Sequence, residues 1–146
     1  MTTATTDPLE IDTVTGRVVV PPSDLIQMVQ PMPGFEACRR YVLIAAPELA
    51  PFTCLHGVDT PQPVFVTIDP HLVDPDYHVT LGPAERRRLG AVDDEPLLWL
   101  APVRIDDTGA TANLRAPIVV HPARMVALQF LGADSTYSTA HPLPGR

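Results

Sequence analysis

The chain has 146 residues and a formal net charge of −7, and all ten of its cationic side chains are arginine. A chain of this length forms one domain with a core of its own. Its acidic balance argues against direct nucleic-acid binding, which needs surplus cations against phosphate. No apolar run approaches the roughly 20 residues that span a bilayer, so we expect no membrane contact.

The predicted organisation is a short tail followed by one β domain. Residues 1–8 are small and polar without periodicity and are expected to be disordered, and residues 9–146 form the domain. Short apolar or β-branched runs bounded by Pro, Gly or Asp predict strands. They cover residues 9–14, 17–20, 24–28, 40–45, 52–57, 64–69, 78–81, 96–104, 114–120 and 125–131.

Turns and prolines support this interpretation. Gly16 and Gly109 stand where tight hairpins require a positive φ, and the second predicts antiparallel pairing of the strands at 96–104 and 114–120. Pro117, inside its apolar run, indicates an edge strand or a bulge. Eighteen prolines against eight glycines favour many short strands over long helices.

One helix is expected, with Pro83 at its first turn and Gly90 as its C-terminal stop. Arg86, Arg87 and Arg88 fit either a phosphate patch or the solvated face of this helix, and the acidic context favours the solvated face. A turn is expected at 35–39. The predicted fold class is mainly β: a small antiparallel β-barrel-like single domain with one short helix.

A shared core is expected from the apolar runs of these strands. Its predicted members are Val66, Ile68, Leu98, Trp99, Leu100, Ile118, Val119 and Leu128.

No catalytic or metal-binding motif stands out. His56, His71 and His78 lie near several aspartates, but no pair has the spacing of a known zinc motif. The chain has no G-x-S-x-G elbow and no Gly-rich phosphate loop. We therefore expect no enzymatic activity, no metal and no cofactor.

The cysteines indicate the compartment. Cys38 and Cys54 stand far apart with no Cys-x-x-Cys pair, and the Thr-rich start lacks a signal-peptide pattern. We expect buried or half-buried free thiols and a cytoplasmic protein.

Six segments in order resemble a known family. They are Pro33-Gly34-Phe35-Glu36, Phe52-Thr53-Cys54-Leu55-His56-Gly57-Val58-Asp59, Val64-Phe65-Val66-Thr67-Ile68-Asp69-Pro70, Pro75-Asp76-Tyr77, Thr111-Ala112-Asn113-Leu114-Arg115-Ala116-Pro117-Ile118-Val119 and Tyr137-Ser138-Thr139-Ala140-His141-Pro142-Leu143. Together they resemble the flagellar assembly factor FliW family across nearly the whole chain.

The resemblance implies a non-enzymatic bacterial protein of the cytoplasm with two protein partners. Members of the family bind the RNA-binding translational repressor CsrA and, in a mutually exclusive way, newly made flagellin. Flagellin that accumulates in the cytosol captures the factor and so frees the repressor to stop flagellin translation. An acidic chain suits a basic, RNA-binding partner, because complementary charge raises the encounter rate.

The chain departs from the family pattern at two places. Val29-Gln30-Pro31 replaces a Pro-Glu-Gly run, which exchanges a flexible glycine for a stiff proline. Ala140 stands where a basic residue often precedes the tail histidine.

The predicted partner surface combines family motifs that fall at turns, strand ends or the C-terminal tail. Its residues are Phe35, Glu36, Asp69, Pro70, Asp76, Tyr77, Asn113, Tyr137, Ser138 and His141. Tyr137 is the expected anchor, since its ring and hydroxyl offer apolar contact and a directed hydrogen bond. The alternative is that the tail docks on its own barrel and covers a strand edge.

Two other functions stay open at this point. One is a small-molecule enzyme, which needs titrating groups that converge on a pocket. The other is a direct nucleic-acid-binding β-barrel, which needs a basic groove with stacking aromatics.

Overall fold

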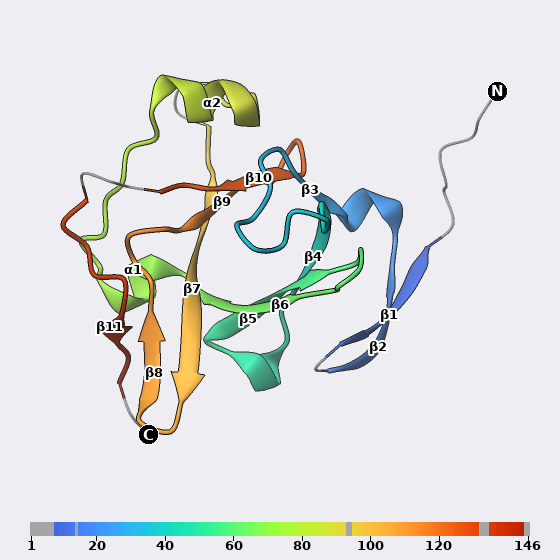
Figure 1. Ribbon diagram of the computed structural model, residues 1–146, viewed down its shortest axis with the longest axis horizontal. Coiled ribbons are helices and arrows are strands. Elements are labelled where there is room, and N and C mark those ends of the chain that lie inside the picture. Colours follow the sequence, from blue (N-terminus) through green and yellow to red (C-terminus); the bar gives the residue numbers. More distant parts are fainter. Residues whose placement is uncertain (1–7, 14, 93–94, 132–134, 145–146) are drawn as a thin grey trace.

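Most strands of the protein form one closed barrel (Figure 1). The computed structural model describes residues 8–13, 15–92, 95–131 and 135–144. Around the barrel the strands follow the order β7, β6, β5, β4, β3, β10 and β9, and pairing of β7 with β9 closes the ring. Their bounds are β3 Ile26–Met28, β4 Arg40–Ile44, β5 Phe52–Gly57, β6 Val64–Ile68, β7 Leu98–Asp106, β9 Ile118–His121 and β10 Val126–Gln129.

The predicted barrel-like β fold is confirmed, with one difference in strand direction. β3 and β10 pair in parallel, while the other pairs of the barrel are antiparallel. A parallel pair needs a long connection between its strands. The other barrel strands lie between β3 and β10 in the chain. No local sequence pattern therefore predicts that these two strands pair.

Smaller elements surround the barrel. β1 (Leu9–Thr13) and β2 (Gly16–Val20) form a separate hairpin, and β11 (His141–Pro142) pairs with β8 (Gly109–Ala112), which pairs with β7. The helices are α1 (Pro70–Val73) and α2 (Pro83–Leu89), with 3-10 turns at Pro22–Asp24 and Pro47–Leu49. No helix among the described residues is long and apolar enough to cross a membrane.

Alternation along the strands divides the apolar residues into four clusters. Tyr41 and Leu43 belong to the interior cluster, whereas Val42 and Ile44 belong to an outer cluster that includes Ile11 of the hairpin. This follows from the two-residue period of a strand. Two more outer clusters lie under the C-terminal tail and under α2.

The prediction of one shared core was therefore wrong. Leu98, Leu100 and Ile118 face the barrel interior. The other predicted members are spread over the three outer clusters, and Trp99 lies partly buried between two of them. A barrel wall that is covered outside is apolar on both faces, so composition alone could not separate the clusters.

Two predicted strands and one predicted hairpin need correction. Residues 78–81 form no strand, and the run at 114–120 becomes a turn followed by the shorter β9. β9 pairs on both sides, with β10 and β7, so it is not an edge strand, and Pro117 lies just before it. β7 and β9 do pair antiparallel, but the hairpin at Gly109 joins β7 to β8, which the sequence pattern missed.

The turns and the helix boundaries that were predicted from single residues agree with the structure. Helix α2 begins at Pro83 and ends before Gly90, which has a left-handed φ of 66°. Gly16 and Gly109 have φ values of 110° and 131°, as their turns require. Residues 35–39 form the expected turn, with the Cys38 N–H donating to the Phe35 carbonyl. The predicted disordered segment lies outside the described residues except for Pro8.

Candidate functional site

Eight of the ten predicted partner residues gather on one side of the molecule, which we call the tail face. They come from α1 and the loop after it, the turn before β9, and the C-terminal tail. The outer cluster beneath them contains Ile68, Ala101 and Leu114. The tail-face residues are Asp69, Pro70, Asp76, Tyr77, Asn113, Tyr137, Ser138 and His141.

Two tyrosines form the centre of the tail face. Tyr77 is 5% exposed, and its hydroxyl donates to the Leu114 carbonyl at 2.8 Å. Its ring centroid lies 4.7 Å from that of half-buried Tyr137. Burial, followed by the neighbouring Tyr137, raises the pKa of Tyr77 to about 12. Tyr77 is therefore a neutral phenol that holds the loop after α1 to the turn before β9.

Tyr137 is bound into the same structure by its hydroxyl and its carbonyl. The hydroxyl accepts from the His78 N–H at 2.9 Å, and the carbonyl accepts from Arg115 Nε at 2.9 Å. Two donors that are far from each other in the chain thus fix one aromatic residue. This agrees with the alternative of a self-docked tail, although an anchored tail still presents its outer side to solvent.

Asn113 stabilises the turn before β9, and Ser138 stabilises a turn within the C-terminal tail. The Asn113 side-chain oxygen accepts from the N–H groups of Arg115 and Ala116, both at 3.1 Å. Ser138 accepts from the Ala140 N–H through its hydroxyl and from the Leu114 N–H through its carbonyl. His141 then pairs with Ala112 across β11 and β8. The tail covers the free edge of β8 in this way.

Asp69 and Pro70 begin α1 on the same face. One Asp69 oxygen accepts from the His71 N–H and lies 2.9 Å from His71 Nδ1. Pro70 is buried as the first helical residue, which matches the preference for proline there. The ring centroids of His71 and Tyr77 lie 5.6 Å apart, and the two ring planes are nearly perpendicular. Asp76 is exposed.

Phe35 and Glu36 lie elsewhere, on the connection between β3 and β4, which we call the turn face. Phe35 packs against the barrel interior, with its ring perpendicular to that of Phe65 at 5.3 Å. Glu36 is exposed and accepts from the Gly34 N–H, and this bond is the main cause of its lowered pKa. Among the described residues, no hydrogen bond, ion pair or ring contact joins this pair to the tail face. The ten predicted partner residues therefore lie on two faces, the tail face and the turn face, and do not form one surface.

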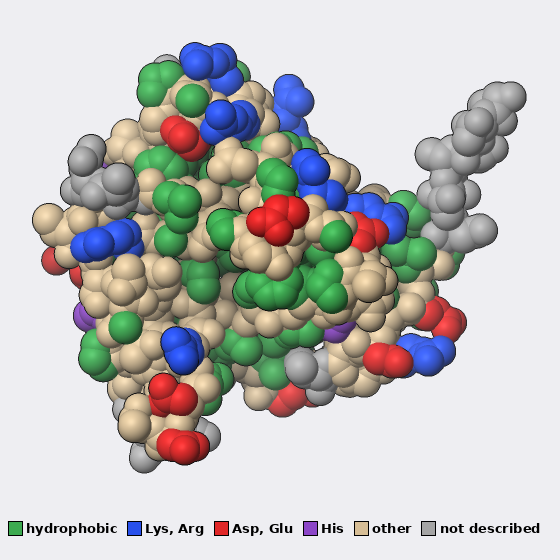
Figure 2. Space-filling model, viewed as in Figure 1, with side chains coloured by type: hydrophobic (Ala, Val, Ile, Leu, Met, Phe, Trp, Pro, Cys, Tyr) green, Lys and Arg blue, Asp and Glu red, His purple; other side chains and the backbone are tan. Residues whose placement is uncertain are grey.

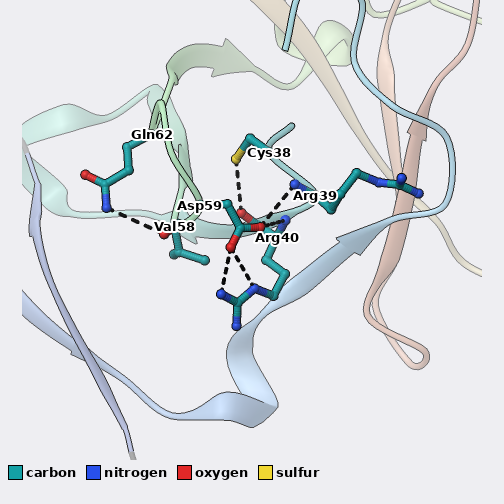
Figure 3. A network of polar contacts seen from close by, with 6 residues as sticks. All are labelled: Cys38, Arg39, Arg40, Val58, Asp59 and Gln62. Atoms are coloured by element: carbon teal, nitrogen blue, oxygen red, sulfur yellow. Dashed lines mark hydrogen bonds and ion pairs between the residues drawn. The ribbon is translucent and has the colours of Figure 1, made fainter. Parts of the chain in front are cut away.

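A polar network centred on Asp59 was not predicted from the sequence (Figure 3). One Asp59 oxygen accepts from the N–H groups of Arg39 and Arg40, and the other from Nε and Nη2 of Arg40. The Arg40 side chain is the main cause of the lowered Asp59 pKa. This network ties the start of β4 to the loop after β5. The sequence did point to Asp59, because it is the last residue of one of the six family-like segments.

The structure offers little support for metal or thiol chemistry. In the described part of the chain, no three His, Cys, Asp or Glu side chains gather as metal ligands. Cys38 and Cys54 are free and buried, as predicted, and burial raises the pKa of the Cys54 thiol.

A groove of about 580 Å³ runs beside Tyr137, His78 and Glu85. It provides a recess at the border of the tail face.

The two departures from the family pattern have defined surroundings. Gln30 accepts a hydrogen bond from Arg88 Nη1 at 2.8 Å, so the Val29-Gln30-Pro31 segment is fastened to α2. Val29 also packs against the cluster beneath that helix. Ala140 is exposed on the tail.

Comparison with known proteins gives a consistent result. The family model described as FliW protein matches residues 10–143. The flagellar assembly factor FliW of Geobacter sulfurreducens is 33% identical over 129 residues, covering 87% of this chain and 80% of that protein. The FliW of Moorella thermoacetica is also 33% identical, over 131 residues, covering 88% and 83% of the two chains.

A solved structure agrees in fold. The crystal structure of a flagellar assembly factor FliW superimposes with a TM-score of 0.83 at 27% identity, covering 92% of this chain and 97% of the other. The chain belongs to the FliW family.

Proposed function

We propose that this protein is a cytoplasmic, non-enzymatic flagellar assembly factor that binds a CsrA-type translational repressor and is itself captured by flagellin. Flagellin that accumulates before assembly then removes the factor from the repressor, and the freed repressor stops further flagellin synthesis. The observation that carries this proposal is the match to FliW proteins over residues 10–143.

Charge supports the repressor half of the proposal. The chain has 17 acidic against 10 basic residues, for a net charge of −7. An RNA-binding repressor presents basic surface, so opposite charge steers the encounter and disfavours other acidic proteins. We expect the affinity for the repressor to fall as ionic strength rises, because the Debye length shrinks to about 8 Å at physiological salt.

The tail face and the turn face are the proposed contact regions. On the tail face, hydrogen bonds from His78 and Arg115 hold Tyr137 in place before any partner arrives. A contact surface that is already ordered loses less entropy on binding. Two separate faces are also compatible with two partners that exclude each other, if the partners overlap sterically or share one face.

The test is direct binding of the purified full chain to the repressor and the flagellin of the same host. Titration calorimetry gives each affinity, and a competition experiment with labelled target RNA shows whether the chain releases RNA from the repressor. Flagellin added to that mixture should restore RNA binding. Absence of binding to both partners would refute the function. Direct binding of the RNA by this chain alone would favour the nucleic-acid alternative.

Three charge-reversal variants distinguish partner binding at the tail face from partner binding at the turn face. Asp76→Arg changes the tail face, Glu36→Arg changes the turn face, and Asp107→Arg makes the same change on the exposed tip of the β7–β8 hairpin. We expect at least one of the first two to weaken a partner by about tenfold, while Asp107→Arg stays within about twofold. Equal effects of all three would show that net charge, and not a face, controls binding.

A further inference from the structure

The arginines of this acidic protein are unevenly placed. Figure 2 shows cationic side chains gathered over α2 and the neighbouring edge of the barrel, whereas acidic side chains predominate along the opposite edge. Helix α2 alone carries Arg86, Arg87 and Arg88 in its last turn. At that end of the helix the positive side chains also meet the negative pole of the helix dipole.

Arg124 joins this group from the turn between β9 and β10. A Cβ built on Gly90 would lie 2.8 Å from Arg124 Nε and 3.0 Å from its Cζ. The guanidinium group therefore lies directly against the residue that ends α2. Arg87, Arg88 and Arg124 are all exposed.

Arg88 and Arg39 extend the group across β3. Arg88 donates to the Gln30 side chain just after this strand, and Arg39 Nη2 donates to the Met28 carbonyl at its end, at 3.2 Å. Arg39 Nε is buried and has no acceptor among the described residues. We define Arg39, Arg87, Arg88 and Arg124 as the arginine face.

Nearby carboxylates are already engaged. Glu85 lies 4.0 Å from Arg88 on the same helix. Glu95 accepts from the Val92 N–H at 2.7 Å and lies 3.1 Å from His121 Nε2. Asp93 and Asp94 fall outside the described residues. The placed carboxylates thus leave the arginine face with an excess of guanidinium donors.

We propose that the arginine face binds a short acidic segment of a partner protein. A guanidinium group forms two parallel hydrogen bonds with a carboxylate, and it is more weakly hydrated than an ammonium group. Several arginines on one face therefore suit a segment with several Asp or Glu side chains. None of the four arginines belongs to the tail face, and the proposal does not depend on the function proposed above.

A nucleic acid fits this face less well. A phosphate polymer continues beyond the arginines onto a chain of net charge −7, where it is repelled. Base recognition also relies on stacking aromatics. The aromatic pairs of the described residues are formed by Phe35, Tyr41, Phe65, His71, Tyr77 and Tyr137, none of which belongs to α2 or to the turn between β9 and β10.

The experiment measures fluorescence anisotropy of a labelled oligoglutamate peptide titrated with the full chain. The double variant Arg87→Gln/Arg124→Gln removes two charges from the arginine face. The matched control Arg17→Gln/Arg104→Gln removes two exposed charges from β2 and β7, so both variants have the same net charge. Thermal melting checks that each variant is folded.

We expect the arginine-face variant to bind the peptide about tenfold more weakly than the unchanged chain and the control to stay within about twofold. Binding should weaken as salt is added. Equal losses in both variants, or no binding by the unchanged chain at low salt, would overturn the proposal. Tighter binding of a single-stranded RNA of equal charge would assign the face to nucleic acid instead.

Discussion

The rings of Tyr77 and Tyr137 pack 4.7 Å apart, and each phenol oxygen is hydrogen-bonded to the backbone of a different segment. Tyr77 donates to Leu114, and Tyr137 accepts from His78. The pair therefore joins the loop after α1, the turn before β9 and the C-terminal tail. Any partner that contacts the tail face meets a surface whose shape depends on these two residues.

Tyr137 is predicted to contribute to stability as well as to binding. Tyr137→Phe removes the acceptor of the His78 N–H and should cost about 1 kcal/mol of unfolding free energy. Tyr137→Ala also removes the ring contact with Tyr77 and should cost about 2–3 kcal/mol. Urea denaturation measures both changes, and calorimetry with each partner measures binding. If the folded alanine variant binds both partners normally, Tyr137 is purely structural.

Asp59 is predicted to make stability depend on pH. Its pKa is lowered, chiefly by Arg40, so its contribution is present above the unfolded pKa of about 3.9 and is lost as pH falls through the folded value. Asp59→Asn should lose about 1 kcal/mol at pH 7, after allowance for screening of the partly exposed pair. Below about pH 4 the difference from the unchanged chain should shrink. A difference that stays constant between pH 7 and pH 3 would contradict this assignment.

Gly57 is predicted to tolerate no side chain. A Cβ at this position would lie 2.7 Å from both Cys38 Sγ and Pro63 Cδ. Gly57→Ala should therefore destabilise the fold by about 2 kcal/mol through overpacking. Adding Cys38→Ala should recover part of the loss, because it removes one of the two clashes. Guanidinium denaturation of the two single variants and the double variant gives the coupling, and simple additivity would show that the sulfur contact is unimportant.

The two thiols are predicted to react only when the protein opens. Cys38 and Cys54 are buried, and burial raises the pKa of the Cys54 thiol, which lowers its thiolate fraction. An aromatic disulfide reagent should modify them at least about a thousandfold more slowly in native protein than in concentrated urea. Fast reaction of either thiol in the folded protein would indicate local opening of β5 or of the turn before β4.

The site was only partly accessible to sequence reasoning. The family-like segments brought Tyr77, Asn113 and Tyr137 to notice, and the structure places these residues on one face. The same segments contained Asp59, whose role depends on a contact between its loop and Arg40 of β4. Nothing local indicates that Phe35 lies apart from the tail, because this separation depends on how the barrel closes.

Local chemistry by itself determined the strand-rich character of this protein, the glycine turns at Gly16 and Gly109, and the helix between Pro83 and Gly90. Each of these depends on the φ preferences of one or two residues or on a short apolar run. Only the tertiary structure decided the pairing of β7 with β9, the parallel contact of β3 with β10, and the docking of β11 on β8. These contacts join segments distant in sequence, and what selects them is the burial of both faces of the barrel wall, which no single segment encodes.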